Sequence, residues 1–459
     1  MKRFVEGVNR DQSTLFPEKL DDFVAEDNAV RVVDAFVEAL DLRTLGFKGV
    51  DPSVTGRPAY HPAVLLKLYI YGYLNRIASS RRLEREAQRN VELMWLIERL
   101  APDFKTIADF RRDNGKAIAN VCREFVTVCR RLELFTEAIV AIDGSKFKAV
   151  NNGDRNFTPR RLQQRMERVE QHINRYLNAL SRADREGGEV PEAKATDLKE
   201  KLARLRAEMK RLKVIEVELE RQPDKQLSLT DPDARVMATR HRNSGVVGYN
   251  VQSAVDTKHH LIVAHEVSNA VTDRKQLSSM ARQARDAVDT DELSVVADRG
   301  YFSGVEIRAC QQEGIRPLVP KSHTSSNRLR GRFTKDDFRY DTDTDQYTCP
   351  AGEALTWRFQ TVESGLNIDV YFSSACKKCA IKARCTTSDY RRIRRWEHEA
   401  DVDAMLSDLD RHPETMALRK QTVEHPFGTL KAWMGATHFL TRTLKHVRTE
   451  MSLHVLAYN

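Results

Sequence analysis

The sequence predicts an α/β protein, a mixed sheet flanked by helices, with a helical N-terminal domain and two insertions. Three observations support this fold class. Helical patterns fill the first part of the chain, short apolar runs typical of strands then alternate with helical patterns, and two segments of different character interrupt that alternation. Because 459 residues are too many for one simple core, we expect two to four substructures.

The composition favours a polyanionic partner. Lys and Arg number 75 against 66 acidic residues, which gives a net charge of +9. A basic chain of this kind suits DNA, although an enzyme that is only incidentally basic would have the same balance. No apolar signal core follows Met1, and no run approaches the roughly 18 apolar residues that a membrane helix needs. We therefore expect a cytoplasmic protein with no membrane partner.

Residues 1–135 are predicted to form the N-terminal helical domain. Pro62 begins a long apolar helix, because proline is favoured in the first helical turn, and apolar residues recur at helical spacing over 118–129. Arg81 and Arg82 stand at the start of another helix. Short helices with basic residues suit a helix-turn-helix DNA reader, while a packing domain with solvated arginines explains the same residues equally well.

The segment 136–157 is predicted to contain the first strand of the sheet. The β-branched run 138–142 has the length and composition of a buried strand, and Asp143 is the first polar residue after it. We expect this carboxylate to lie just past the strand end, with Gly144 leaving room beside it. There it could hold a metal ion, or it could simply be a turn or cap residue.

A helical hairpin is predicted for 158–225. Apolar residues recur there in steps of four and three, which is a heptad seam, and Gly187, Gly188 and Pro191 divide the seam into two helices. We expect the hairpin to project from the globular body. Its many basic residues are either DNA contacts or a solvated face.

The sheet is predicted to continue over 226–321 and to be completed by helices in 409–459. The order of elements gives a mixed sheet with an antiparallel start. The expected strands are 245–256 and 260–267, joined by a turn at 257–259, then 293–298 and 315–320, with helices over 274–288 and 306–313.

A cysteine-rich insertion is predicted for 322–408. Four of the seven cysteines cluster there, and four thiolates in one short segment suit a tetrahedral structural zinc ion. The alternatives are reduced thiols without a metal, or the remnant of a former metal site. A basic stretch at 391–396 follows as a further candidate for DNA contact. The four cysteines are Cys349, Cys376, Cys379 and Cys385.

Three acidic residues are candidates for a catalytic metal centre. Asp143 and Asp298 each follow an apolar strand, and Glu424 lies on a late helix that could cross them. Carboxylate oxygens suit Mg²⁺ or Mn²⁺, and two such ions can activate a water or a 3′-hydroxyl and stabilise the leaving oxygen. Alternatively, Glu424 could pair with Lys420 on its own helix. Lys431 follows two turns later and could hold a phosphate.

These residues carry a resemblance to a known family. The chain resembles bacterial insertion-sequence transposases of the DDE type over nearly its whole length. The matching stretches are Asp143-Gly144-Ser145, Ala297-Asp298-Arg299-Gly300-Tyr301, and Val423-Glu424-His425-Pro426-Phe427-Gly428 with Lys431.

The resemblance implies an RNase H-like catalytic domain, built from 136–157, 226–321 and 409–459. It implies two Mg²⁺ or Mn²⁺ ions held by Asp143, Asp298 and Glu424, and cut-and-paste transfer of an element bounded by terminal inverted repeats into target DNA. Because two element ends are handled together, a homodimer on DNA is expected, in the bacterial cytoplasm at the nucleoid. A family member would also be expected to continue beyond the apolar C-terminal residues of this chain.

The resemblance also suggests DNA-binding residues. In the family, a tyrosine and an arginine precede the glutamate at fixed offsets, but Ala417 and Lys420 occupy those positions here. Two rival functions remain, a nuclease of the same fold that cuts without joining and a DNA-end-binding repressor without chemistry. The candidate DNA contacts are Arg299, Tyr301, Arg419, Lys420 and Lys431, with Arg81 and Arg82 in the N-terminal domain.

Overall fold

The N-terminal part is a bundle of helices, as predicted. The computed structural model describes residues 19–52, 58–135, 138–185, 192–238, 245–322 and 326–459. Helix α2 begins at Pro62 and is buried on almost all sides, because its neighbours pack around it. The helices are α1 (Ala29–Glu38), α2 (Pro62–Leu74), α3 (Ser80–Ala87), α4 (Val91–Leu96), α5 (Phe104–Asp113) and α6 (Gly115–Arg131), with a 3₁₀ turn at Leu20–Phe23.

The central body is the predicted mixed α/β sheet. Its strands run in the order β4-β5-β1-β7-β8, and β6 also pairs with β5. Strand β1 is antiparallel to β5 and parallel to β7, and β7 is parallel to β8. The elements are β1 (Ile139–Lys148), β4 (Arg235–Met237), β5 (Val246–Asp256), β6 (Ile262–Ser268), β7 (Ser294–Ala297) and β8 (Arg316–Leu318), with helices α9 (Leu277–Val288) and α10 (Gly304–Gln312).

Strand β1 is longer than the sequence predicts. It continues past Ile142 to Lys148, so Asp143 lies inside the strand and the predicted strand-end position is wrong. The cause is the pairing on either side. Strand β7 ends at Ala297, opposite Ile142, whereas β5 accompanies β1 along its whole second half. The apolar run marks only the part of β1 that has a strand on both sides, and Asp143 is the first residue beyond it.

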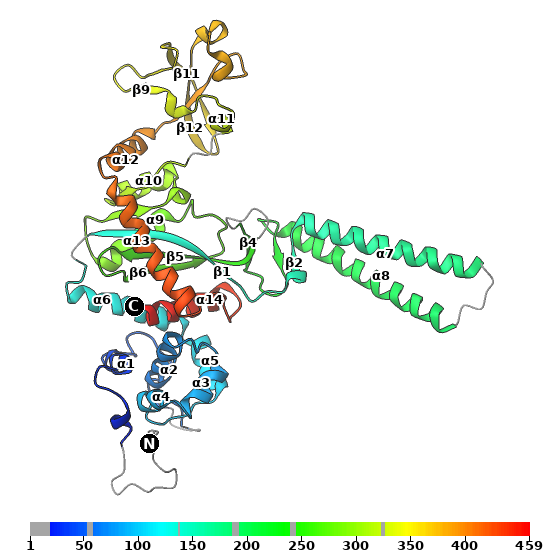
Figure 1. Ribbon diagram of the computed structural model, residues 1–459, viewed down its shortest axis with the longest axis vertical. Coiled ribbons are helices and arrows are strands. Elements are labelled where there is room, and N and C mark those ends of the chain that lie inside the picture. The colour runs from blue at the N-terminus through cyan, green and yellow to red at the C-terminus, as the bar shows by residue number, and fades with distance from the viewer. Residues whose placement is uncertain (1–18, 53–57, 136–137, 186–191, 239–244, 323–325) are drawn as a thin grey trace, which may run out of the picture.

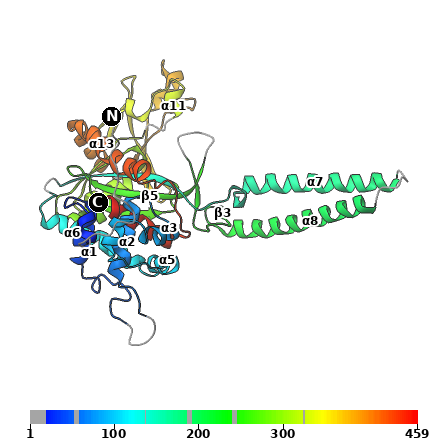
Figure 2. The same ribbon diagram turned by 60° about the horizontal axis from the view of Figure 1, so that its bottom comes forward.

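The predicted helical hairpin projects from this body (Figures 1 and 2). It consists of α7 (Pro159–Arg185) and α8 (Glu192–Arg221), and the predicted break at residues 187–191 lies outside the described residues. At its base, short strands β2 (Asn156–Phe157) and β3 (Leu227–Ser228) pair, and Phe157 packs with apolar residues of both helices. The hairpin therefore has a small apolar core of its own.

The cysteine-rich segment folds around a five-stranded antiparallel sheet, in the order β13-β12-β11-β10-β9. After it, α12 (Glu399–Arg411) packs against α10 and β8, although most of α12 falls in the range predicted for the insertion. An ion pair of 2.8 Å between Arg395 and Asp403 links β13 to α12. The strands are β9 (Arg339–Asp341), β10 (Gln346–Thr348), β11 (Ala354–Glu363), β12 (Leu366–Phe372) and β13 (Ile393–Trp396), preceded by α11 (Ser326–Leu329).

Two C-terminal helices connect the sheet to the bundle. Helix α13 (Glu414–Gly428) crosses the sheet beside β1 and β7 and continues into a π-helical turn, Thr429–Trp433. Helix α14 (Leu444–Tyr458) is buried, and Figure 1 shows it with α6 between the sheet and the helices α1 to α5. Among the described helices, none has the length and apolar character needed to span a membrane.

Candidate active site

The two predicted aspartates lie side by side, Asp143 inside β1 and Asp298 just after β7. Strands β1 and β7 pair in parallel with Ile142 opposite Ala297. The next residue is Asp143 in one segment and Asp298 in the other. Asp298 caps the turn that follows β7, and its Oδ1 accepts a hydrogen bond of 2.7 Å from the backbone N–H of Gly300. The sheet register thus brings together two acids that are far apart in the sequence.

Asp143 is paired with an arginine from α13. The Nη2 atom of Arg419 lies 3.0 Å from Asp143 Oδ1, and both side chains are largely buried. Burial raises the pKa of Asp143 to about 6, the charge of Arg419 opposes that rise, and the nearby Asp298 and Asp273 add to it. Arg419, expected from the sequence to contact DNA, therefore faces the acidic centre.

A third aspartate, which the sequence did not reveal, completes this acidic centre. Asp273 lies between β6 and α9, and its Oδ1 accepts hydrogen bonds from Asn250 Nδ2 (2.6 Å) and Gln252 Nε2 (2.8 Å). Lys146 Nζ is 3.3 Å from the same oxygen. No strand or helix pattern marks Asp273. Asn250 and Gln252, two amides in a mostly buried strand, were the available signal.

Lys431 also belongs to this region. Its Nζ donates hydrogen bonds to Ser145 Oγ (2.5 Å) and to the carbonyl of Lys146 (3.1 Å), and it lies 4.5 Å from the ring centroid of Phe147. Burial lowers the pKa of this ammonium, while the charge of Asp143 raises it. A lysine predicted to hold a phosphate is therefore anchored to β1 next to Asp143.

Glu424 stands apart from the two aspartates in this arrangement. It is on the exposed side of α13 and makes no hydrogen bond or ion pair with any residue that the structure describes. Within the described ranges, no three His, Cys, Asp or Glu side chains are arranged to hold a metal ion. The structure thus assembles Asp143 and Asp298, and leaves Glu424 on the helix that lies across them.

The other predicted contacts divide into buried and exposed residues. Tyr301 is fully buried and its hydroxyl donates to Gln252, so it supports the site from within instead of facing outward. Arg299 and Lys420 are exposed near the acidic centre. On α3, Arg81 and Arg82 are exposed as well; Arg81 lies over the ring of Phe104.

The four clustered cysteines come together in the insertion. Cys349, Cys376, Cys379 and Cys385 all line one small cavity. Burial raises the pKa of the Cys385 thiol, and the proximity of the other three sulfurs adds to the rise. The four thiols therefore lie in one part of the insertion, although their present arrangement does not form a metal site among the described residues.

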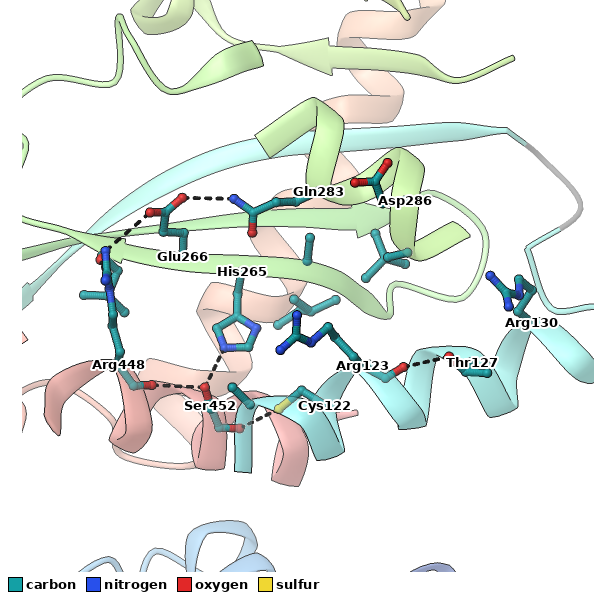
Figure 3. A pocket seen from close by; sticks show the side chains of 16 residues that line it. Cys122, Arg123, Thr127, Arg130, His265, Glu266, Gln283, Asp286, Arg448 and Ser452 are labelled. Atoms are coloured by element: carbon teal, nitrogen blue, oxygen red, sulfur yellow. Dashed lines mark hydrogen bonds and ion pairs between the residues drawn. The ribbon is translucent and has the colours of Figure 1, made fainter. Parts of the chain in front are cut away.

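A larger cavity of about 510 Å³ lies elsewhere, between α6, β6, α9 and α14 (Figure 3). His265 Nε2 is 2.9 Å from Ser452 Oγ, and Arg448 is 3.4 Å from Glu266. Burial lowers the pKa of His265 to about 4, so this imidazole is neutral at physiological pH. None of the predicted site residues lines this cavity.

Comparison with protein families identifies the chain. Residues 224–459, slightly more than half of the chain, match the family described as "Transposase DDE domain". The chain belongs to the DDE transposases. Residues 18–113 of this transposase match a second family, described as "Transposase domain (DUF772)". No curated protein and no solved structure matches the chain.

Membership of this family confirms the RNase H-like fold class and the general activity. DDE transposases bind and cleave DNA and use divalent metal ions. The DDE match includes Asp298 and Glu424, whereas Asp143 lies between the two matched segments, just before the hairpin. The place of Asp143 beside Asp298 therefore comes from the sheet register and not from the family match.

The raised pKa of Asp143 predicts a pH-dependent stability. Because its pKa is about 6 in the folded chain and 3.8 in a model peptide, protonation favours the folded state. This contribution is fully present below the unfolded-state pKa and is lost as the pH rises through about 6. Without metal, we expect the unfolding free energy of the wild type to fall relative to Asp143→Asn by at most about 3 kcal/mol over this window.

Urea unfolding in the presence of a chelator, at several pH values between 4 and 7, measures this difference. The exposed Asp291 provides a matched control, since Asp291→Asn should track the wild type at every pH. If the difference in unfolding free energy between the wild type and Asp143→Asn stayed constant with pH, the pKa of Asp143 would not be raised in the folded chain.

Proposed function

We propose that this protein is a cut-and-paste transposase. It would cleave DNA at the terminal inverted repeats of an element and join the released 3′ ends to target DNA. The observation that supports this most strongly is the β1/β7 register, which sets Asp143 beside Asp298 beneath the helix that carries Glu424. The N-terminal match to a second transposase family supports the same function.

The residues at this site fit a hard divalent cation. All donors are carboxylate oxygens, which Mg²⁺ and Mn²⁺ prefer, and burial disfavours the ionised form of Asp143 until a cation compensates it. Asp143 and Asp298 would hold the metal, with Glu424 as the third carboxylate from α13. Two bound ions supply an activated water or 3′-hydroxyl and stabilise the leaving oxygen.

The basic residues around the acids have complementary roles in this proposal. Arg419 would exchange its contact with Asp143 for a DNA phosphate when a cation is bound. Lys431, fixed on β1 by Ser145, would hold a phosphate as a point charge. Exposed basic residues would bind the flanking DNA backbone, Arg299 and Lys420 near the acids and Arg81 and Arg82 on α3.

We further propose that two copies of the chain act together on DNA, because two element ends must be brought to one target. The enzyme would work where the bacterial chromosome lies, in the cytoplasm. We also propose that Cys349, Cys376, Cys379 and Cys385 bind one zinc ion. With four protein ligands the ion would have no open position, so it would stabilise the insertion and would not catalyse.

The catalytic proposal is tested by strand cleavage and joining on DNA that carries the element ends, in Mg²⁺. The substitutions Asp143→Asn, Asp298→Asn and Glu424→Gln should each lower both steps by on the order of a hundredfold or more, since each removes a charged metal ligand with little change of shape. Glu414→Gln, an exposed acid at the start of α13, is the matched control and should retain full activity.

The outcome also separates the rival functions. Joining of cleaved ends supports transposition, cleavage without joining indicates a nuclease, and binding without cleavage indicates a repressor. If any of the three acidic variants kept wild-type activity, that residue would not belong to the metal centre.

The zinc proposal predicts one equivalent of zinc in the purified protein, measured by elemental analysis. Cys376→Ala should lose the metal and destabilise the insertion, because the ion is held by only four ligands. Cys310→Ala, which changes a cysteine buried far from the cluster in sequence, should keep a full equivalent. Wild-type protein that is free of zinc after expression in zinc-supplemented medium would contradict the proposal.

A further inference from the structure

Asp273 is built into the acidic centre more firmly than either predicted aspartate. One of its oxygens accepts hydrogen bonds from two β5 side chains, Asn250 at 2.6 Å and Gln252 at 2.8 Å, and lies 3.3 Å from the ammonium of Lys146 on β1. Asn250 and Gln252 are both fully buried. Three donors on one oxygen fix the carboxylate in a single orientation.

The other oxygen of Asp273 is turned toward the turn that Asp298 caps. A methyl group added at Gly300 would lie 2.9 Å from Asp298 Oδ1 and 3.8 Å from Asp273 Oδ2. A methyl group at Gly144, the residue after Asp143, would lie 2.7 Å from Asp273 Oδ1. The two glycines therefore leave the space through which Asp273 approaches both acid-bearing segments.

A hydrogen-bond chain extends from Asp273 to the same turn. Gln252 donates to Asp273 and accepts from the hydroxyl of Tyr301, the last residue of the turn that begins at Asp298. Tyr301 is fully buried, so this contact has no competition from solvent. A movement of Asp273 would consequently be transmitted to the position of the Asp298 carboxylate.

We propose that Asp273 is a positioning residue for the metal-holding carboxylates Asp143 and Asp298. This inference rests on the function proposed for that site. Asp273 fixes the turn after β7 through Gln252 and Tyr301, and its negative charge strengthens the preference of the centre for a divalent cation. Carboxylates that orient metal ligands without binding the metal commonly change metal affinity by tenfold to a hundredfold.

Mn²⁺ binding to the full-length protein without DNA, followed by electron paramagnetic resonance, tests the inference without relying on turnover. In Asp273→Asn the remaining oxygen can still accept the three hydrogen bonds, but the charge is gone. We expect Mn²⁺ to bind about tenfold to a hundredfold more weakly, with a melting temperature within a few degrees of the wild type. Asp291→Asn, at an exposed aspartate before β7, should bind Mn²⁺ normally.

Tyr301→Phe is a second variant that removes only the hydroxyl linking Gln252 to the turn. It should weaken Mn²⁺ binding severalfold and leave the charge of the centre unchanged. Mn²⁺ binding that requires Asp143 but is unaffected by both Asp273→Asn and Tyr301→Phe would overturn this inference alone. Mn²⁺ binding that is also unaffected by Asp143→Asn would overturn the proposed metal centre, and the inference with it.

Discussion

The parallel pairing of β1 with β7 is the constraint on which the site depends. It sets Ile142 opposite Ala297, so Asp143, inside β1, lies beside Asp298, the first residue after β7. Because side chains alternate between the faces of a strand, a shift of one residue would send Asp143 to the other face. The pairing of β1 with β5 along nine consecutive residues, from Val140 to Lys148, holds that register.

This register brings the carboxylates of Asp143, Asp298 and Asp273 close together in a partly buried site, and their mutual repulsion costs free energy. The chain offsets the cost with Arg419 on Asp143 and with Lys146 and two amides on Asp273. The compensation is incomplete, since burial still raises the pKa of Asp143 to about 6. The Nε atom of Arg419 is buried and lacks a hydrogen-bond partner among the described residues. Both observations are consistent with the proposed binding of a divalent cation and a DNA phosphate at this centre.

Features that depend on local sequence patterns could be predicted from the sequence. Features that depend on contacts with distant segments of the chain could not. Heptad spacing predicted the hairpin because the two helices pack mainly on each other. The length of β1 was not predictable, because its second half pairs mainly with β5, about a hundred residues later in the sequence. Asp143 and Asp298 were found from their apolar flanks. Asp273 was missed because its importance comes from Asn250, Gln252 and Lys146, which only folding brings to it.

In the proposed enzyme, segments that are distant in the sequence form one cation site. Iron-mediated cleavage tests this proposal most directly: Fe²⁺ replaces Mg²⁺ in the full-length protein, and ascorbate with peroxide generates radicals that cut the backbone beside the metal. We expect cuts near residues 143, 273, 298 and 424, and we expect excess Mg²⁺ to suppress them. Cuts confined to other segments, or cuts near 298 without any near 143, would contradict the proposal.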